Sequence, residues 1–365
     1  MTRLILTSAS GLSLVKSGLA DIVVPFSFRF VWGMLPSPDE LAACLAARSA
    51  EHGPGSHWSD YVGRWSRAER ARKDLRLLEF CRDCETIELW FDPCPNDQLQ
   101  LVWLLDYFRF HPEIASRLRL RLVDFDLVVA QAEELGRWKV RDVEVTEAEL
   151  ETARAAWQAY GAPTPAACFS LLGRDLGALP LLRPALLDLL EELPSRRTGL
   201  GATEMRLLEL IARGYSHPNE LFYLWGLRQR RVFNDWEIGY LLDALAHGPT
   251  PAVAGLDDEL RTIKRDNYRS RLEAYRRSRL SLTEFGEAVL AQNEDFSRRN
   301  PIHRWWGGSG RPGLPTLSSR SSTGLFRKGR CRTPNSPHSL GCARNDNVGP
   351  TGSTLCRLGV SKDMT

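Results

Sequence analysis

Two polar turns carry the side chains that could do chemistry in this chain, and each turn follows an apolar run typical of a strand. Backbone amides at the start of a helix hold anions, and nearby hydroxyl and amide side chains add hydrogen bonds. In open α/β sheets, ligands bind beyond the carboxyl ends of the strands, where both turns are expected to lie. We therefore predict a site for a small anionic ligand, built from Ser8 and Ser10 of the first turn and from Asp92, Asn96, Asp97 and Gln98 of the second.

Both turns also have a structural interpretation that needs no ligand. Residues 8–11 (SASG) are small enough to make a tight turn, and they match neither of the glycine-rich phosphate-binding patterns. Asn96 and Asp97 are residue types that favour the start of a helix, so Asn96 is expected as an N-cap. The ligand site is therefore a hypothesis that rests on topology.

Other reactive residue types show no spacing that predicts a reaction or a metal. Cys81 and Cys84 form a lone C-x-x-C to which Cys94 could add a third thiolate, but zinc sites of this type need a second pair or matched histidines. The seven histidines have no metal-ligand spacing, and no G-x-S-x-G motif is present. We predict no metal site and no cofactor, and whether the chain is an enzyme stays open.

The stretch 86–108 predicts how the second turn is positioned. Apolar and β-branched residues at 86–91 indicate a buried strand, which Pro93 and Pro95 end because proline has no amide N–H for the ladder. Apolar residues then recur at helical spacing. Three further strands are expected at 3–7, 21–26 and 118–123, with helices between them. This alternation predicts an α/β fold, with a small, mainly parallel sheet and flanking helices, over a Rossmann-like domain at residues 1–135.

The rest of the body is predicted to be mainly helical. Residues 136–197 are expected to form a helical linker region, in which a charged helix over 140–160 contains the capping box Thr146-x-x-Glu149. Residues 198–308 then show three helices, a short strand, a charged excursion, a returning strand and a final helix. The order of these elements predicts a winged-helix-like domain.

A winged-helix-like domain suggests two uses, contact with DNA or contact with protein. A third helix that reads DNA should offer Arg, Lys, Asn or Gln to base edges, whereas the third predicted helix, 235–247, presents acidic and apolar side chains. Phosphate contacts without base readout are open to a set of basic residues, namely Arg228, Arg230, Arg231, Lys264 and Arg265. A protein partner is the favoured use, and DNA is the weaker alternative.

The net charge of +3 is unevenly distributed. Residues 309–365 hold seven Arg and two Lys against two Asp, so this tail carries +7 and leaves −4 for residues 1–308. A mildly acidic body gives no support to general nucleic-acid binding. The tail has no apolar periodicity and is rich in Gly, Pro, Ser and Arg, which predicts disorder and indicates a shifted reading frame or read-through.

The chain resembles a bacterial family in a set of motifs that includes Asp97-Gln98-Leu99. The others are LWF at 89–91, TGLGATE at 198–204, RLSLTEFGEAVL at 279–290 and RWWGG at 304–308. They are similar to motifs of the domain of unknown function 1835 and its C-terminal partner, the domain of unknown function 3658, over residues 1–308. That family often opens with a Gly-Asp-Ser turn, where this chain has Ser8-Ala9-Ser10. The resemblance implies a fold and no particular reaction.

Three functional hypotheses follow. No apolar run reaches the length of a membrane span, and the opening residues do not form a signal peptide, so we expect a cytoplasmic protein without membrane contact. The favoured hypothesis is a binding or regulatory protein that senses a small anionic ligand in its α/β half and relays the signal to its helical half. The second is an enzyme acting on a nucleotide-like or phosphorylated small molecule at the same residues. The third is a winged-helix DNA-binding regulator.

Overall fold

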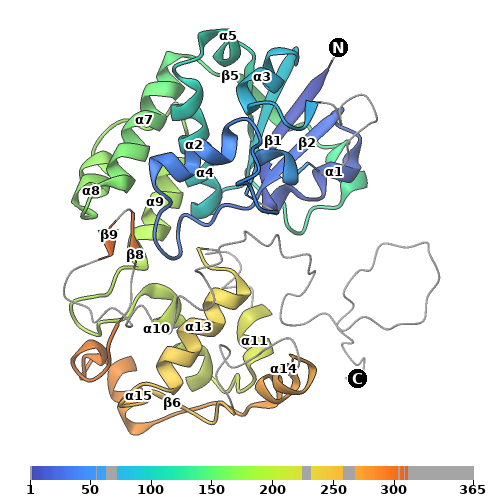
Figure 1. Cartoon of the computed structure of the whole chain (residues 1–365). Helices are drawn as coiled ribbons and strands as arrows, with labels where there is room; N and C mark the ends of the chain where they lie inside the picture. Colours follow the sequence, from blue (N-terminus) through green and yellow to red (C-terminus); the bar gives the residue numbers. More distant parts are fainter. Residues whose placement is uncertain are drawn as a thin grey trace.

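The sheet of the first half has five strands in the order β2-β1-β3-β4-β5 (Figure 1). In the computed structural model these are β1 Arg3–Ser8, β2 Ile22–Phe26, β3 Thr86–Phe91, β4 Leu118–Leu122 and β5 Arg141–Glu144. The first four strands are parallel, and β5 runs antiparallel to β4. Parallel strands covered on both faces are apolar throughout, and every residue of β2 is buried. The prediction of an α/β fold with a small, mainly parallel sheet is confirmed.

The structure describes residues 2–54, 56–62, 72–223, 232–257, 268–302, 305–307 and 309–310. The predicted nucleic-acid contacts at Arg228, Arg230, Arg231, Lys264 and Arg265 lie outside these residues, as does the tail from residue 311. Among the helices that the structure describes, none combines the length and the apolar composition that crossing a bilayer requires.

Strand β1 lies where the strand order reverses. The chain leaves β1 for β2 on one side and later places β3 on the other side, so that Leu6 lies between Val24 and Leu89. In sheets of this kind a crevice forms beyond the carboxyl ends of the strands at the reversal point. Here the two strands are β1 and β3, whose carboxyl ends lead to Ser8 and to Asp92.

Helices cover both faces of this sheet (Figure 1). One face packs on α4 Pro95–Phe108, and α7 Glu147–Gly161 lies along α4 in the same hydrophobic core. The other face is covered by α1 Leu14–Ser17 and α6 Ala132–Leu135, over a smaller cluster that contains Ile5. Further helices of this half are α2 Pro38–Leu45, α3 Leu77–Arg82, α5 Pro112–Ala115, α8 Ala166–Leu172 and α9 Leu182–Glu191.

Residues 136–197, the predicted helical linker region, contribute to the core of the first half. Ala156 of α7 and Leu186 of α9 are buried in the same cluster as α4. The capping box is present, since the Glu149 carboxylate accepts a hydrogen bond from the Thr146 amide at 2.7 Å. The charged helix expected from residue 140 instead begins at Glu147, because the preceding residues pair with β4 as β5.

The second half has the element order of a winged helix. Its elements are α10 Ala202–Ala212, α11 Pro218–Tyr223, α13 Asp235–Ala246, β6 Val253–Ala254, α14 Tyr268–Arg277, β7 Ser281–Leu282 and α15 Glu284–Leu290. Strands β6 and β7 pair antiparallel, with Val253 opposite Leu282. A second hydrophobic core joins these elements, and Leu208, Leu242 and Val289 are fully buried in it. Among the residues that the structure describes, three helices, a short strand, a returning strand and a final helix follow in the predicted order, and α14 lies in the charged stretch between the two strands.

Aromatic side chains join the two halves. Trp32, in the loop between β2 and α2, stacks on Tyr240 of α13 with ring centroids 6.2 Å apart. The same indole meets Phe233 edge-on at 5.5 Å, just before α13 begins. Helix α13 therefore turns one face toward the first half of the chain.

The last described residues return to the first half as a short two-stranded segment, β8 Trp305–Trp306 and β9 Ser309–Gly310, which Figure 1 shows between α9 and the helices of the second half. The Gly307 carbonyl between these strands accepts a hydrogen bond from the Leu35 amide at 3.3 Å. Trp306 is buried in the first core, with its ring 5.4 Å from that of Tyr160. We call residues 305–310 the return segment.

Candidate functional site

The turn after β1 is tied to the start of α4 by hydroxyl contacts. Ser8, the last residue of β1, is 1% exposed and donates its hydroxyl to the carboxylate of Asp97, which is 2% exposed. The Ser10 hydroxyl lies 3.5 Å from the same carboxylate, and the Ser10 amide donates to Ser8 Oγ at 3.0 Å. The predicted residues Ser8, Ser10 and Asp97 are therefore brought together, although 87 to 89 positions separate the serines from the aspartate.

The sequence of this turn explains how closely it lies against the strands. Thr7 donates its hydroxyl to the Trp90 carbonyl at 2.5 Å, which links β1 to β3 just before both strands end. A Cβ atom added at Gly11 would meet Thr7 Oγ1 at 2.1 Å and Leu14 Cδ1 at 3.0 Å. Only glycine allows the turn to approach this closely. Residues 8–11 (SASG) therefore form a tight turn, as the structural interpretation expected. The turn also directs the hydroxyls of Ser8 and Ser10 toward α4.

The turn after β3 brings three possible metal-ligating side chains together. Asp92, Cys94 and Asp97 each offer one ligand atom, and these atoms all lie within 4.8 Å of one another. Asp92 is 1% exposed, and its Oδ1 accepts a hydrogen bond from the Cys94 amide at 3.0 Å. Cys94 occupies the N-cap position of α4, with Pro95 at the first helical position. From the sequence, Cys94 is considered only as an addition to the C-x-x-C pair. The D-x-C-x-x-D spacing across a strand-to-helix turn is the signal that would have identified this set.

Asn96 is used to hold the protein backbone. Its Oδ1 accepts from the Phe30 amide at 2.8 Å, and its amide group donates to the Phe28 carbonyl at 2.9 Å. Gln100, one turn later, donates to the same carbonyl at 3.1 Å. The expectation that Asn96 caps α4 is wrong, because the N-cap is Cys94 and the helix begins at Pro95, two residues earlier than expected. Asn96 instead fixes the aromatic loop 26–32 against α4.

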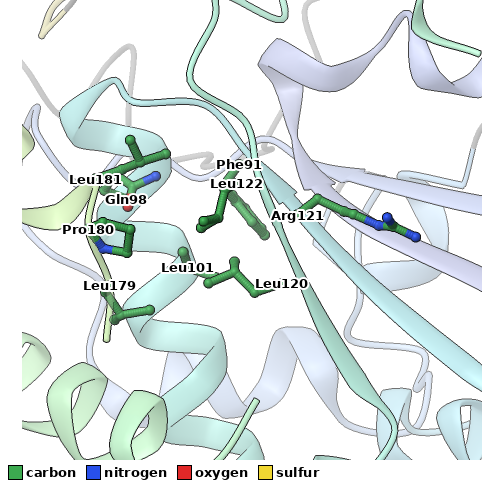
Figure 2. A pocket seen from close by; sticks show the side chains of 9 residues that line it. All are labelled: Phe91, Gln98, Leu101, Leu120, Arg121, Leu122, Leu179, Pro180 and Leu181. Atoms are coloured by element: carbon green, nitrogen blue, oxygen red, sulfur yellow. The ribbon is translucent and has the colours of Figure 1, made fainter. Parts of the chain in front are cut away.

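Gln98 is likewise engaged with backbone. Its side-chain amide donates to the Asp92 carbonyl at 2.8 Å, which fixes the end of β3. Figure 2 shows Gln98 among the side chains that line a small hollow, most of which are apolar and include Leu101, Leu120 and Leu179. The volume of this hollow, about 10 Å³, is near the lower limit for one water molecule. The described residues therefore give Gln98 a structural part, and the hollow has no room for an organic ligand.

Arg29 links the site to the second half. Its guanidinium donates to both carboxylate oxygens of Glu237 on α13, at 2.9 and 2.5 Å, and to the Val232 carbonyl at 3.3 Å. Burial disfavours the charge of this guanidinium, but the pKa of Arg29 is raised because Glu237, together with the charges of Cys94 and Asp97, outweighs burial. Sequence reasoning did not identify Arg29, because its partner lies 208 positions away.

Helix α13 is the helix that would read DNA in a winged-helix protein. Its first turn is closed by a capping box, in which Asn234 accepts from the Glu237 amide and Glu237 accepts from the Asn234 amide, both at 2.9 Å. Glu237 also holds Arg29, and Tyr240 lies on Trp32. The first turns of α13 therefore contact the first half of the protein, where a DNA-reading helix needs an open face.

The C-x-x-C pair lies in the core. Cys81 and Cys84 are both 0% exposed, and Cys84 donates its thiol to the Phe80 carbonyl at 3.6 Å. Burial raises the pKa of both thiols, that of Cys84 to about 11. Thiols that are buried and protonated are poor nucleophiles and poor metal ligands.

Comparisons with known proteins add no relative to these observations. No protein-family model matches the chain, and no curated protein matches it. The site must therefore be interpreted from its own geometry.

Proposed function

We propose that this chain is a cytoplasmic ligand-binding or regulatory protein, which binds a small anionic ligand beyond the carboxyl ends of β1 and β3 and transmits binding to its helical half. The observation that carries this proposal is the convergence of Ser8, Ser10 and Asp97 beyond the carboxyl ends of β1 and β3, together with Arg29, which binds α13 and whose pKa the Asp97 charge helps to raise. Crevices at the reversal point of a parallel sheet are the usual ligand sites of this fold class.

Donors for an anion are available at this place. The hydroxyls of Ser8 and Ser10 are hydrogen-bond donors, and α4 directs its N-terminus toward the same turn. Asp97 accepts from both serines, so a ligand that takes over these hydroxyls must compete with this carboxylate. Binding of an anion is therefore expected to be coupled to a change in the charge of the Asp92–Asp97 turn.

Arg29 supplies the proposed relay. The Arg29 guanidinium binds Glu237 of the second half, and the charge of Asp97 at the start of α4 contributes to its raised pKa. An anion in the crevice adds a further partner for this guanidinium and so changes the strength of its bond to α13. A ligand shifts a conformational equilibrium only by its difference in affinity for the two states. Arg29 is the residue on which the ligand and Glu237 would both act.

A thermal-shift screen of the full chain tests this proposal. The probes are nucleotides, sugar phosphates, inorganic phosphate and short duplex DNA. A ligand that binds only the folded state raises Tm, because it adds about 2.7 kcal/mol to the free energy of unfolding at a concentration of 100 times Kd. A phosphorylated small molecule should raise Tm, and Ser8→Ala should reduce the shift. Ser170→Ala, an exposed serine on α8, is the matched control and should leave the shift unchanged. Loss of the shift in both variants, or no shift with any small anion, would contradict the proposal.

An enzyme acting on a nucleotide-like or phosphorylated small molecule is the second candidate. The observation that favours it is the buried contact between the Ser8 hydroxyl and the Asp97 carboxylate, since a carboxylate next to a hydroxyl can accept its proton. Any ligand from the screen should then be incubated with the chain and analysed for conversion. Conversion that Asp97→Asn abolishes while binding persists would favour the enzyme over the sensor.

A DNA-binding regulator and membership of the family named above also stay proposals. A shift of Tm by duplex DNA alone, with affinity that falls steeply as salt rises, would favour the regulator. The family proposal rests on Asp97-Gln98-Leu99 and the later motifs. Of these residues, Asp97 contacts the two serines, and Gln98 holds the end of β3.

A further inference from the structure

The three side chains at the start of α4 form a donor set of mixed chemistry. We propose that Asp92, Cys94 and Asp97 bind a zinc ion, and that the remaining coordination position of this ion takes the anionic ligand. The second part rests on the proposed function, whereas the first stands on the donor set alone. The set lies at the carboxyl ends of β1 and β3, because Asp92 follows β3 directly and Asp97 contacts Ser8 at the end of β1.

The ligand types select zinc. Zinc accepts thiolate and carboxylate ligands in one tetrahedral site, whereas magnesium and calcium prefer oxygen ligands throughout. Three protein ligands with one open position are the arrangement of zinc sites that bind a further molecule, and structural sites have four. Two carboxylates and one thiolate match the first arrangement.

The distances require little rearrangement. Zinc–oxygen bonds of about 2.0 Å and a zinc–sulfur bond of about 2.3 Å place tetrahedral oxygen and sulfur ligands roughly 3.5 Å apart. The ligand atoms of Asp92, Cys94 and Asp97 already lie within 4.8 Å of one another. Side-chain movements of up to about 1.3 Å, the difference between 4.8 Å and roughly 3.5 Å, would bring the ligand atoms to these separations.

The carboxylates are held in orientation by neighbouring groups. The Cys94 amide donates to Asp92 at 3.0 Å, and the hydroxyls of Ser8 and Ser10 approach Asp97. Ligating carboxylates in metal sites are oriented by hydrogen bonds of this kind. Cys94 is half-buried, while Asp92 and Asp97 are 1% and 2% exposed, so the thiol side of the set is the side by which an ion can enter.

Zinc also resolves an electrostatic conflict in the predicted anion site. Two carboxylates in a buried place repel an anionic ligand, yet Asp92 and Asp97 both belong to the set of residues predicted to bind one. A divalent cation between them reverses the local charge and can bind an anion directly.

Cobalt substitution tests the zinc site with an optical signal. Co²⁺ bound to a thiolate gives a charge-transfer absorption band, which reports directly on Cys94. The full chain is used with its three tail cysteines, Cys331, Cys342 and Cys356, replaced by serine, so that the band arises only from the body. After chelator treatment and dialysis, we expect one Co²⁺ per chain, a thiolate band, and displacement of the band by one equivalent of Zn²⁺.

Variants assign the ligands. Cys94→Ala should remove the band, and Asp97→Asn should weaken Zn²⁺ binding, measured calorimetrically, by at least about 10-fold. Cys44→Ala, a buried cysteine on α2 outside the donor set, is the control and should keep both band and affinity. Near-ultraviolet circular dichroism without metal establishes that each variant is folded. A band that survives in Cys94→Ala, or no Zn²⁺ binding by a folded parent chain, would overturn the proposal.

The zinc site and the anion site fail separately. Anions that raise Tm equally in the chelator-treated chain and in the presence of Zn²⁺ would refute the role of zinc in anion binding while the proposed function stands. A Co²⁺ complex whose thiolate band no anion perturbs, in a chain that no anion stabilises, would keep the metal site and refute the proposed function.

Discussion

Arg29 and Glu237 form a two-bonded ion pair that joins the loop after β2 to the first turn of α13. The guanidinium contacts both carboxylate oxygens, at 2.9 and 2.5 Å, and Glu237 is only 4% exposed. Glu237 also closes the capping box of α13 through Asn234. The Glu237 carboxylate therefore both caps α13 and joins the two halves. Substitutions at Arg29 should for this reason lower the stability of the first turn of α13.

Arg29→Ala should destabilise the protein by about 2 kcal/mol, because the variant leaves Glu237 buried without its cation. Breaking a fully buried pair costs roughly 3–5 kcal/mol, and the smaller value follows because the Arg29 side chain is 34% exposed and partly screened by solvent. Urea unfolding of parent and variant measures the difference. The control is Arg154→Ala, from an exposed pair with Glu151, which should cost less than about 0.5 kcal/mol. Equal effects of the two substitutions would contradict the junction role.

Glu88→Gln should change how stability depends on pH. Glu88 on β3 is 1% exposed and accepts from Arg121 at 3.0 Å and from Trp90 at 2.7 Å. Burial opposes its charge, but these hydrogen bonds and the charges of Arg121 and Arg3 outweigh burial, so the pKa of Glu88 is lowered from 4.5. A lowered folded-state pKa means that the carboxylate stabilises the fold fully above the unfolded value and loses this effect as pH falls through the folded value.

The stability difference between parent and Glu88→Gln should therefore be constant from pH 7 down to about pH 5 and shrink below about pH 4.5. Urea unfolding at several pH values from pH 7 down to about pH 3 measures this difference in the free energy of unfolding. Glu151→Gln, an exposed residue of α7, should show no such change. A difference that grows on acidification would have the wrong sign.

Gly307→Ala should loosen the return segment. Gly307 has φ +48°, and an added Cβ would meet the Tyr160 carbonyl at 2.2 Å. The positive φ and the close carbonyl both disfavour any residue other than glycine. We therefore expect the free energy of unfolding to fall by more than about 1 kcal/mol and hydrogen exchange at the Leu35 amide to become faster. Gly136→Ala is the control, because its φ is −66° and nothing lies within 4 Å of the added atom. It should be neutral or slightly stabilising, and the same loss in both variants would refute this account.

Asn96→Ala should destabilise the fold without acting on ligand affinity directly. It removes the acceptor of the buried Phe30 amide and a donor to the Phe28 carbonyl. An unsatisfied buried amide costs about 1–3 kcal/mol, which thermal unfolding will register. Gln131→Ala, at an exposed position before α6 with no side-chain cap bond, should change stability by less than about 0.5 kcal/mol. A stable Asn96→Ala that fails to bind the ligand would make Asn96 a ligand contact after all.

The local elements of this fold are predictable from sequence because their signals are local. The apolar run at 86–91 predicts β3, and the capping box predicted at Thr146 and Glu149 is present at the start of α7. The short strands β6 and β7 pair where the winged-helix order expects them. The pairing of β6 with β7 joins distant residues such as Val253 and Leu282, but the elements themselves depend on residues within a few positions of one another.

Strand β5 shows where such reasoning ends. Residues 141–144 (RDVE) are mostly charged and exposed, so no apolar pattern predicts a strand. They pair with β4 through the backbone and through ion pairs, in which Arg119 contacts Asp142 at 2.8 Å and Glu144 at 2.6 Å. Partners about 25 positions away decide the structure here.

The candidate site likewise contains residues whose position the sequence predicts and residues whose partners only the folded chain reveals. Sequence placed Ser8, Ser10, Asp92 and Asp97 at strand ends, and topology brought them together. The amide groups of Asn96 and Gln98 look equally suited to a ligand in the sequence, but each has a backbone partner that only the folded chain supplies. Their assignment as ligand contacts has no support from the geometry.

The return segment has a consequence for the order in which the protein folds on the ribosome. Trp306 completes the core of the first half beside Tyr160, and Gly307 accepts from Leu35. The ribosome must therefore synthesise the entire second half before the first can close this part of its core. A nascent chain stalled before residue 305 should display the Tyr160 region to chaperones, and release of the last strands should end that exposure.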